Sequence, residues 1–239
     1  MRISIVIPAY EAAETIGSVL DRIPKNFYEK TYKIIVVNDG STDNIESVVK
    51  KLKKKYGKII LINHIKNMGY GAAQKTGFNE VLREDADIGV LLHSDGQYAP
   101  ELLPKMVSPI ERNEADVVLG SRILGKSALK GGMPLYKYLG NRFLTFIENM
   151  AYGMKISEFH SGYMVYSKKA LLAIPFNKLS NTYHFDGEMT MMAGKKKLRI
   201  MEIPIPTRYA EEKSHLDPIK YGFDVLKIVW KNMKGGYNF

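Results

Sequence analysis

Five short apolar segments alternate with stretches of helical periodicity, and this alternation limits the fold more than any other feature of the sequence. The apolar segments are residues 3–7, 34–37, 59–62, 88–92 and 117–119. The periodic stretches between them predict helices at residues 12–22, 43–55, 71–83 and 100–112. Strands that alternate with helices at this spacing form a mostly parallel sheet covered on both faces. The first half of the chain is therefore predicted to have a doubly wound α/β layout of the nucleotide-binding kind.

The second half has a different pattern. Residues 133–152 predict a helix with its apolar positions on one side, and residues 219–234 predict a basic helix that contains the only tryptophan, Trp230. Between them we expect strands at 161–167 and 198–203, a helix at 185–193 and a polar loop at 204–218. Both amphipathic helices have the composition of helices that lie in a membrane interface, although packing against a core would explain the first nearly as well.

Length and composition exclude several classes of protein. The chain has 239 residues, which is compatible with one α/β domain, and we expect residues 1–239 to form a single domain. It contains no cysteine, which excludes disulfides and thiolate zinc sites and fits a reducing compartment. No segment reaches the roughly 18 apolar residues of a spanning helix. We therefore expect a cytoplasmic or peripheral protein.

The net charge of +10 predicts an anionic partner, which could be nucleic acid, an acidic lipid surface or a phosphorylated substrate. Lysines are concentrated at residues 50–55 and 195–197. The first group continues a helical apolar pattern, so we interpret it as a solvated helix face.

Polar clusters follow each of the five apolar segments. In a parallel sheet, ligands bind beyond the carboxyl ends of the strands, so five such clusters would meet in one cleft. The clusters read PAYE, NDGSTD, NMGYGAA, HSDGQY and GSR in chain order. This convergence is stronger than any one motif.

The first two clusters are candidates for nucleotide binding. Tyr10 could stack on a base or ribose and Glu11 could accept hydrogen bonds from hydroxyls, although an acid here also suits a helix start. In the second cluster, Gly40 and the residues after it suit a turn and a helix cap, but capping requires neither Asn38 nor Asp39. A carboxylate at a strand end commonly accepts hydrogen bonds from a ribose.

The third cluster is rich in glycine but is neither a dinucleotide fingerprint nor a Walker A sequence. We expect Gly69 and Gly71 to provide close approach between the helix, the sheet and the ligand, and Asn67 to be a possible contact.

The fourth cluster predicts a metal site. Asp95 and Gln97 are two residues apart, so their oxygens would point the same way on an extended chain and could bind Mg²⁺ or Mn²⁺. The alternative is a simple turn, because Ser-Asp-Gly is good turn chemistry. His93 is open to three interpretations: a metal ligand, a group behind the ligands, or a structural histidine.

At these residues the chain resembles the family 2 glycosyltransferases of the GT-A fold. The matching blocks are IVIPAYEAAETI, VVNDGSTDN, NMGYGAAQKTG, HSDGQYAPELLPKM, ADVVLGSR and HSGYMVYSKKAL, in order and spacing, over about residues 2–170. Within the family the chain most resembles the dolichyl-phosphate or polyprenyl-phosphate mannose and glucose synthases. The resemblance implies a three-layer GT-A domain in which residues 1–125 bind the nucleotide and residues 126–239 the acceptor.

The resemblance also implies an activity and site residues. The activity would be inverting transfer of a hexose from GDP-mannose or UDP-glucose to a lipid phosphate at an anionic membrane surface, on its cytoplasmic side. The nucleotide sugar would be held by Pro8, Ala9, Tyr10, Glu11, Asn38, Asp39, Asn67, Gly71, Ser94 and Asp95. Asp95 and Gln97 would bind the metal, with His215 completing it from the polar loop. Arg122 would contact phosphate beside Ser161 and Gly162, and the loop residues Arg208 and Lys213 would add positive charge.

The chain departs from the family pattern at three positions. The family usually has aspartate where Asn38 and His93 stand, so the acidic group at the fourth strand is reduced to Asp95. The arginine that often follows the SGF block is replaced by Met164. The first two changes leave the metal dependent on Gln97 and the donor. The third removes one candidate phosphate contact and so weakens the prediction of the acceptor.

The acceptor decides whether the reaction needs a base. A phosphate is already an anionic nucleophile, whereas a hydroxyl requires a carboxylate to take its proton, and Asp186 or Glu188 is the candidate. Alternatively, these two acids only begin a helix. Three functions therefore remain: transfer to a lipid phosphate, transfer to a soluble or glycan hydroxyl, and non-catalytic binding of nucleotide or nucleic acid. The third is disfavoured, and we expect no nucleic-acid partner, because such a protein needs no acidic cleft.

Overall fold

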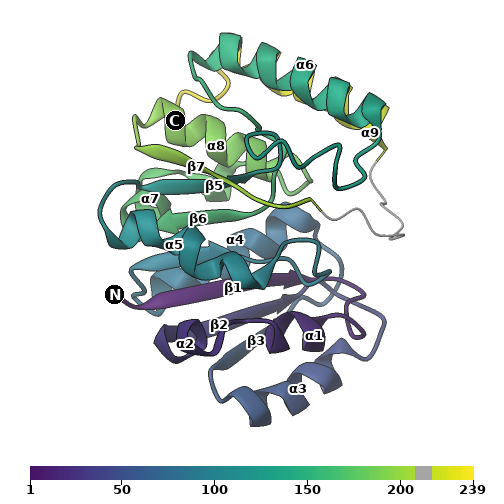
Figure 1. Cartoon of the computed structure of the whole chain (residues 1–239), viewed down its shortest axis with the longest axis vertical. Coiled ribbons are helices and arrows are strands. Elements are labelled where there is room, and N and C mark those ends of the chain that lie inside the picture. The colour runs from purple at the N-terminus through teal and green to yellow at the C-terminus, as the bar shows by residue number, and fades with distance from the viewer. Residues whose placement is uncertain (208–216) are drawn as a thin grey trace.

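A seven-stranded sheet runs through the computed structural model, which describes residues 1–207 and 217–239 (Figure 1). The strand order is β3-β2-β1-β4-β6-β5-β7. The strands are β1 (Ile3–Ala9), β2 (Thr31–Asn38), β3 (Ile59–Asn63), β4 (Ile88–Leu91), β5 (Val117–Ser121), β6 (Met164–Ser167) and β7 (Ile200–Pro204). All five predicted strands of the first half are present, and the predicted α/β fold is confirmed.

Only β6 runs against the other strands. It lies between β4 and β5 and pairs antiparallel with both, so that Val165 has Val90 on one side and Val118 on the other. The remaining pairs are parallel. Because β4 and β5 have the same direction, the carboxyl ends of six strands meet at one edge, which we call the strand-end edge.

Helices cover both faces of the sheet and create two apolar cores. The first core contains Ile5, Ile34 and Val90, and the second contains Val6, Ile35 and Leu91, as expected for side chains that alternate along strands. Packed into the first core are α1 (Ile16–Asp21), α2 (Lys25–Lys30), α3 (Ile45–Tyr56) and α5 (Leu103–Glu111). Packed into the second are α4 (Tyr70–Arg83), α7 (Lys168–Ala173) and α8 (Phe185–Lys195). Two short 3-10 helices, η1 (Pro100–Leu102) and η2 (Phe176–Lys178), precede α5 and α8.

Several element boundaries differ from those predicted. The first helix begins at Ile16, because residues 12–15 form a turn, and α2 and α7 were not predicted. The first strand extends two residues beyond the predicted segment 3–7, because Pro8 pairs beside Val37 and Ala9 beside Asn38. Asp217 caps the last helix by accepting hydrogen bonds from two backbone N–H groups, which places its start at Pro218. Lysines 50, 51, 53, 54 and 55 are exposed, which confirms the solvated helix face.

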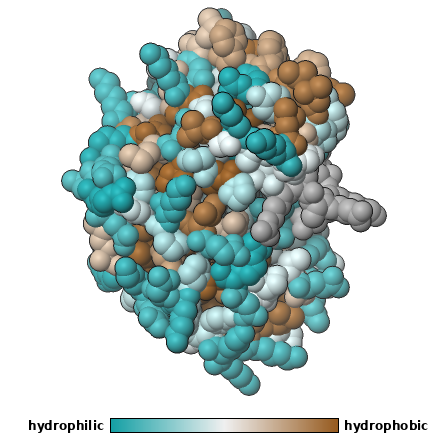
Figure 2. All heavy atoms as spheres, in the orientation of Figure 1, coloured by the Kyte–Doolittle hydropathy of each residue, from teal (hydrophilic) through white to brown (hydrophobic). Residues whose placement is uncertain are grey.

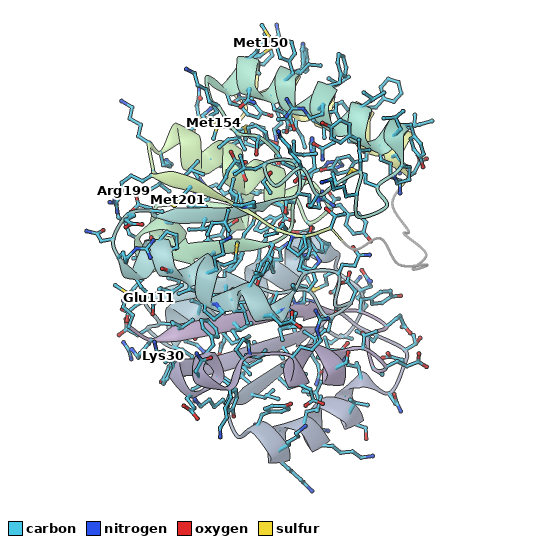
Figure 3. All side chains as sticks on the ribbon, viewed as in Figure 1. Lys30, Glu111, Met150, Met154, Arg199 and Met201 are labelled. Carbon is cyan, nitrogen blue, oxygen red and sulfur yellow. The ribbon has the colours of Figure 1, made fainter. Side chains whose placement is uncertain are left out.

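Two long helices, α6 (Leu135–Tyr152) and α9 (Pro218–Met233), form an outer layer beside α8 (Figure 1). Their apolar side chains point outward: Phe143 of α6 is 61% exposed and Trp230 of α9 is 64% exposed. The other exposed apolar residues here are Leu135, Tyr136, Leu139, Phe146, Met150, Ile219, Phe223, Leu226 and Met233, and we call this whole set the apolar outer face. Figure 2 shows hydrophobic atoms gathered over α6 and α9, and Figure 3 shows Met150 projecting from α6.

The inner side of α6 is polar. Asn141, Thr145 and Glu148 are its buried residues, so packing against a core does not explain its apolar stripe. Ile147 alone of the predicted stripe is half-buried. Within the described residues, no helix is both long enough and apolar enough to cross a bilayer.

Gly77 of α4 tests the contact between this helix and the sheet. A methyl group at this position would collide with the side chain of Val6 on β1. We expect Gly77→Ala to reduce the free energy of unfolding by about 1–3 kcal/mol because the core is already filled. Gly140→Ala is the control, since it adds a methyl group in open space inside α6 and should stabilise by about 0.5–1 kcal/mol. Urea unfolding of both variants measures this, and equal stability of the two would contradict the packing.

Candidate active site

The loop after β1 is bound to the loop after β2. The N–H of Glu11 donates to Ser41 Oγ at 3.0 Å, and the Glu11 carboxylate accepts from the backbone N–H and the hydroxyl of Thr42 at 2.7 and 2.9 Å. These hydrogen bonds, the backbone one first, lower the pKa of the Glu11 carboxyl. Glu11 also has a positive φ of 50°. Tyr10, beside it, is 51% exposed and available for stacking.

Asp39 organises the next loop. Its carboxylate is buried and accepts hydrogen bonds from the N–H groups of Met68 and Gly69, both at 2.9 Å. His64 Nδ1 lies 2.6 Å from the same carboxylate. Asn38 is also occupied, because its side-chain oxygen accepts from the N–H of Ser41 at 3.0 Å. Direct contact of Asn38 and Asp39 with a nucleotide stays a prediction, and what the structure gives them is control of loop shape.

The glycines at the start of α4 provide close approach to the segment before α8, whereas the prediction was close approach to the sheet and the ligand. Gly69 has a φ of 102°, and a Cβ on it would lie 2.5 Å from the carbonyl oxygen of Asn181. Gly71 donates its N–H to the same carbonyl at 2.9 Å. Asn67 is exposed on the loop before them. Both glycines therefore lie in close contact with the segment before α8.

Asp95 and Gln97 follow β4 in a turn and not on extended chain as predicted, because Gly96 between them has a φ of 75°. The N–H of Gln97 donates to Asp95 Oδ1 at 2.9 Å, Asp95 is half-buried, Gln97 is exposed, and Ser94 is buried. Among residues 1–207 and 217–239, no group of three or more acidic, histidine or cysteine side chains could hold a metal. A carboxylate and a carboxamide fit Mg²⁺, which usually takes only one or two protein carboxylates and keeps several waters. His215 lies outside the described residues, as do Arg208 and Lys213.

A buried chain of hydrogen bonds connects β4 with α8. Tyr70 Oη lies 2.8 Å from His93 Nε2 and donates to Asp186 Oδ2 at 2.6 Å. Gln74 Nε2 donates to Asp186 Oδ1 at 2.8 Å. Burial raises the pKa of the Asp186 carboxyl, while the hydrogen bond from Tyr70 opposes this.

The two candidate bases are thus already occupied. Asp186 has both carboxylate oxygens engaged, and Glu188 accepts from the N–H of Ser180 at 2.7 Å and from the hydroxyl of Tyr237. Both are buried. Glu188 connects α8 with the end of the chain, which is a structural role.

Arg122 is held at the end of β5 by a buried acid. Its N–H donates to Glu158 Oε2 at 2.7 Å and its Nε donates to Glu158 Oε1 at 2.9 Å, while Nη2 donates to the carbonyl of His160 at 2.6 Å. Asn141 of α6 donates to Glu158 as well, at 3.0 Å. Gly162 follows nearby and donates its N–H to the hydroxyl of Tyr98 at 2.8 Å, and Ser161 is buried beside it.

The structure therefore brings the predicted residues of all five clusters to one edge of the sheet. It also adds residues that the sequence did not single out: His64, Tyr70, Gln74, Glu158 and Asn141. His64, Tyr70 and Gln74 had a signal, because all three lie in or beside a strand-end cluster. Glu158 and Asn141 had none, since they act through contacts made far along the chain.

The family of the chain follows from comparison with known proteins. The model of glycosyl transferase family 2 matches residues 4–174. The chain belongs to glycosyltransferase family 2. It is a glycosyltransferase with a GT-A fold, which confirms the resemblance seen in the sequence.

Two curated relatives of this glycosyltransferase act on dolichyl phosphate by name. The UDP-N-acetylglucosamine–dolichyl-phosphate N-acetylglucosaminyltransferase of Methanococcus voltae is 34% identical over 87% of this chain and 86% of its own length. The dolichol-phosphate mannosyltransferase of Pyrococcus furiosus is 25% identical over 98% of this chain and 64% of its own length.

The solved structures that resemble this glycosyltransferase include glucosyl-3-phosphoglycerate synthase from Mycobacterium tuberculosis, in a complex with Mn²⁺ and UDP. The TM-score is 0.68 with 19% identity, covering 97% of this chain and 79% of the other. At this identity the likeness shows a shared fold.

The raised pKa of Asp186 predicts a pH dependence of stability. Between the unfolded and folded pKa values the native state binds more protons, so this group's contribution to stability falls as pH rises from about 4. We expect the unfolding free energy of the wild type, relative to Asp186→Asn, to decline as pH rises from about 4, as measured by urea titrations at each pH.

Asp85→Asn is the control of opposite sign. Hydrogen bonds from Lys168 and Arg2 lower the pKa of the Asp85 carboxyl. The unfolding free energy of the wild type, relative to Asp85→Asn, should therefore increase as pH rises. A wild-type to Asp186→Asn difference that stays constant from pH 3 to 8 would contradict the effect of burial.

Proposed function

We propose that this glycosyltransferase transfers a hexose from a nucleotide sugar to a polyprenyl or dolichyl phosphate, with inversion and with a bound divalent metal. Residues 1–125 would hold the donor and residues 126–239 the acceptor, with the protein peripheral on the cytoplasmic face of a membrane. Membership of family 2 and the dolichyl-phosphate specificity named for both curated relatives support the proposal.

The observation that carries the proposal is the two-sided character of α6. Its outer side carries exposed apolar residues such as Phe143, while on its inner side Asn141 contacts Glu158, the partner of Arg122. One helix thus joins an apolar surface to a cation at the strand-end edge. A polyprenyl phosphate needs both, because its tail lies in the membrane and its phosphate must reach the donor.

The occupied carboxylates favour a phosphate over a hydroxyl acceptor. A hydroxyl needs a base, yet Asp186 and Glu188 each have both oxygens engaged in the described structure. A phosphate oxygen can attack the anomeric carbon directly, and the bond from that carbon to the nucleoside diphosphate breaks with the electron pair leaving on the diphosphate. The proposal therefore requires no proton transfer.

The chain's own residues would orient the donor and stabilise its departing charge. Asp95 and Gln97 would hold the metal, which when bound would neutralise the diphosphate. Arg122 would contribute fixed positive charge in an orientation set by Glu158. Tyr10 and Glu11 would contact the nucleoside.

The donor is a UDP- or GDP-linked hexose. The resemblance seen in the sequence implies GDP-mannose or UDP-glucose, and the name of the Methanococcus relative adds UDP-N-acetylglucosamine. A thermal-shift panel of these three donors with Mg²⁺ or Mn²⁺ distinguishes them, because stabilisation follows occupancy.

Asp95→Ala tests the catalytic centre. We expect it to abolish transfer to polyprenyl phosphate and to remove Mn²⁺-dependent binding of the donor, because the only carboxylate of the predicted metal site is lost. Radiolabelled sugar transfer and calorimetry measure the two effects. Glu111→Ala, an exposed acid at the end of α5, is the control and should behave as wild type. Wild-type transfer by Asp95→Ala would refute the metal site.

A double variant, Phe143→Glu with Trp230→Glu, tests the membrane contact. Both side chains are largely exposed, so the fold should persist while binding to anionic vesicles weakens at least about tenfold. Sedimentation with vesicles measures it, and wild-type binding should fall as salt rises because exposed lysines of α9 lie beside the apolar outer face.

Leu172→Glu on α7 makes the same kind of change at a distant exposed site and should bind vesicles as wild type. The double variant should still use a short-chain, water-soluble polyprenyl phosphate. Unchanged vesicle binding by the double variant, or a wild-type dimer in solution that hides this face, would contradict the membrane contact.

A further inference from the structure

His93 stands at the end of β4, where the family usually has an aspartate, and the structure shows what accompanies the change. Its Nε2 lies 2.8 Å from the hydroxyl of Tyr70, whose proton is directed to Asp186 at 2.6 Å. A carboxylate is thus present in this part of the site, but it is one phenol away from position 93.

The direction of these hydrogen bonds fixes the tautomer of His93. A phenol has one proton, and Tyr70 gives it to Asp186. Both oxygens of Asp186 accept hydrogen bonds, one from Tyr70 and the other from Gln74, so Asp186 does not donate to Tyr70. Tyr70 must therefore accept from His93, which places the ring proton on Nε2 and leaves a lone pair on Nδ1.

The ring is held firmly in this orientation. Tyr98 packs edge-on against it with centroids 4.9 Å apart, and a Cβ on Gly162 would lie 2.5 Å from Nε2. Nδ1 makes no hydrogen bond to any residue the structure describes, and it is not among the buried polar atoms without a partner. His93 is half-buried, so Nδ1 remains accessible.

We propose that His93 Nδ1 accepts a hydrogen bond from one hydroxyl of the nucleotide-sugar donor, and that Tyr70 and Asp186 are positioning residues that hold it as an acceptor. This inference deepens the proposed function and rests on it. An imidazole lone pair can accept a hydrogen bond from a hydroxyl as a carboxylate oxygen can, but it adds no negative charge beside Asp95. A hydroxyl is the fitting ligand because a lone pair repels the anionic oxygens of phosphate.

The tautomer is tested first, without turnover. Nitrogen NMR of histidine-labelled protein, with His93 assigned through His93→Phe, should show the proton on Nε2. Tyr70→Phe should lose this single tautomer because the hydroxyl acceptor is gone. Tyr183→Phe is the control, since the ring of Tyr183 stacks on Tyr70 but its hydroxyl takes no part in the hydrogen bonds that join His93, Tyr70 and Asp186. A proton on Nδ1 in the wild type would overturn the proposal.

The hydroxyl is then identified by binding. Calorimetry compares whichever of UDP-glucose, UDP-N-acetylglucosamine or GDP-mannose binds with its monodeoxy forms, altered in the sugar or the ribose. His93→Phe should weaken the parent donor about tenfold, the size expected for one hydrogen bond. For one monodeoxy form, wild type and His93→Phe should bind equally, and His93→Asp should restore binding of the parent donor.

The outcomes separate this inference from the proposed function. If His93→Phe weakens every monodeoxy donor by the same factor, His93 does not accept from a hydroxyl and the inference fails. If instead the loss appears only when Mn²⁺ is present, His93 is a metal ligand and the inference also fails. If wild type binds the donors as described but transfers no sugar to polyprenyl phosphate, the acceptor is wrong and the role of His93 stands.

Discussion

Burial of the sheet on both faces is the constraint on which the rest of the structure depends. Since neither face of a strand such as β1 meets water, a polar side chain inside a strand is buried, as Ser4 is, and the polar clusters of the sequence follow the strand ends. Six strands end at the same edge, so the polar clusters of the sequence meet there. The position of the site at the strand-end edge therefore follows from the burial of both faces of the sheet.

The fold was predictable from the sequence because its signal is local. Apolar segments such as residues 34–37 and 88–92 lie within single strands, and the helices between them repeat with their own period. Boundaries moved where a local cap or turn decided them, as with Asp217 before α9. The antiparallel direction of β6 had no local signal, because pairing is decided by strands far along the chain.

The site was predictable in position but not in connectivity. Asp39 was expected to hold a nucleotide from its place in the sequence, yet its carboxylate is bound to N–H groups about thirty residues later. No sequence pattern singles out Glu158, although it sets the orientation of Arg122. Such partners are fixed by the packing of distant segments, which a single sequence does not display.

The place of β6 has a consequence for the order of folding. Strands β1 to β4 form one continuous half of the sheet, and each meets its parallel neighbours soon after it is synthesised. β5 has only β6 and β7 as neighbours, and both follow the long helix α6. Until β6 enters between β4 and β5, the edge of β4 is unpaired and β5 belongs to no sheet. We therefore expect the residues that carry Arg122 to join strands β1 to β4 late, after β6 has entered the sheet.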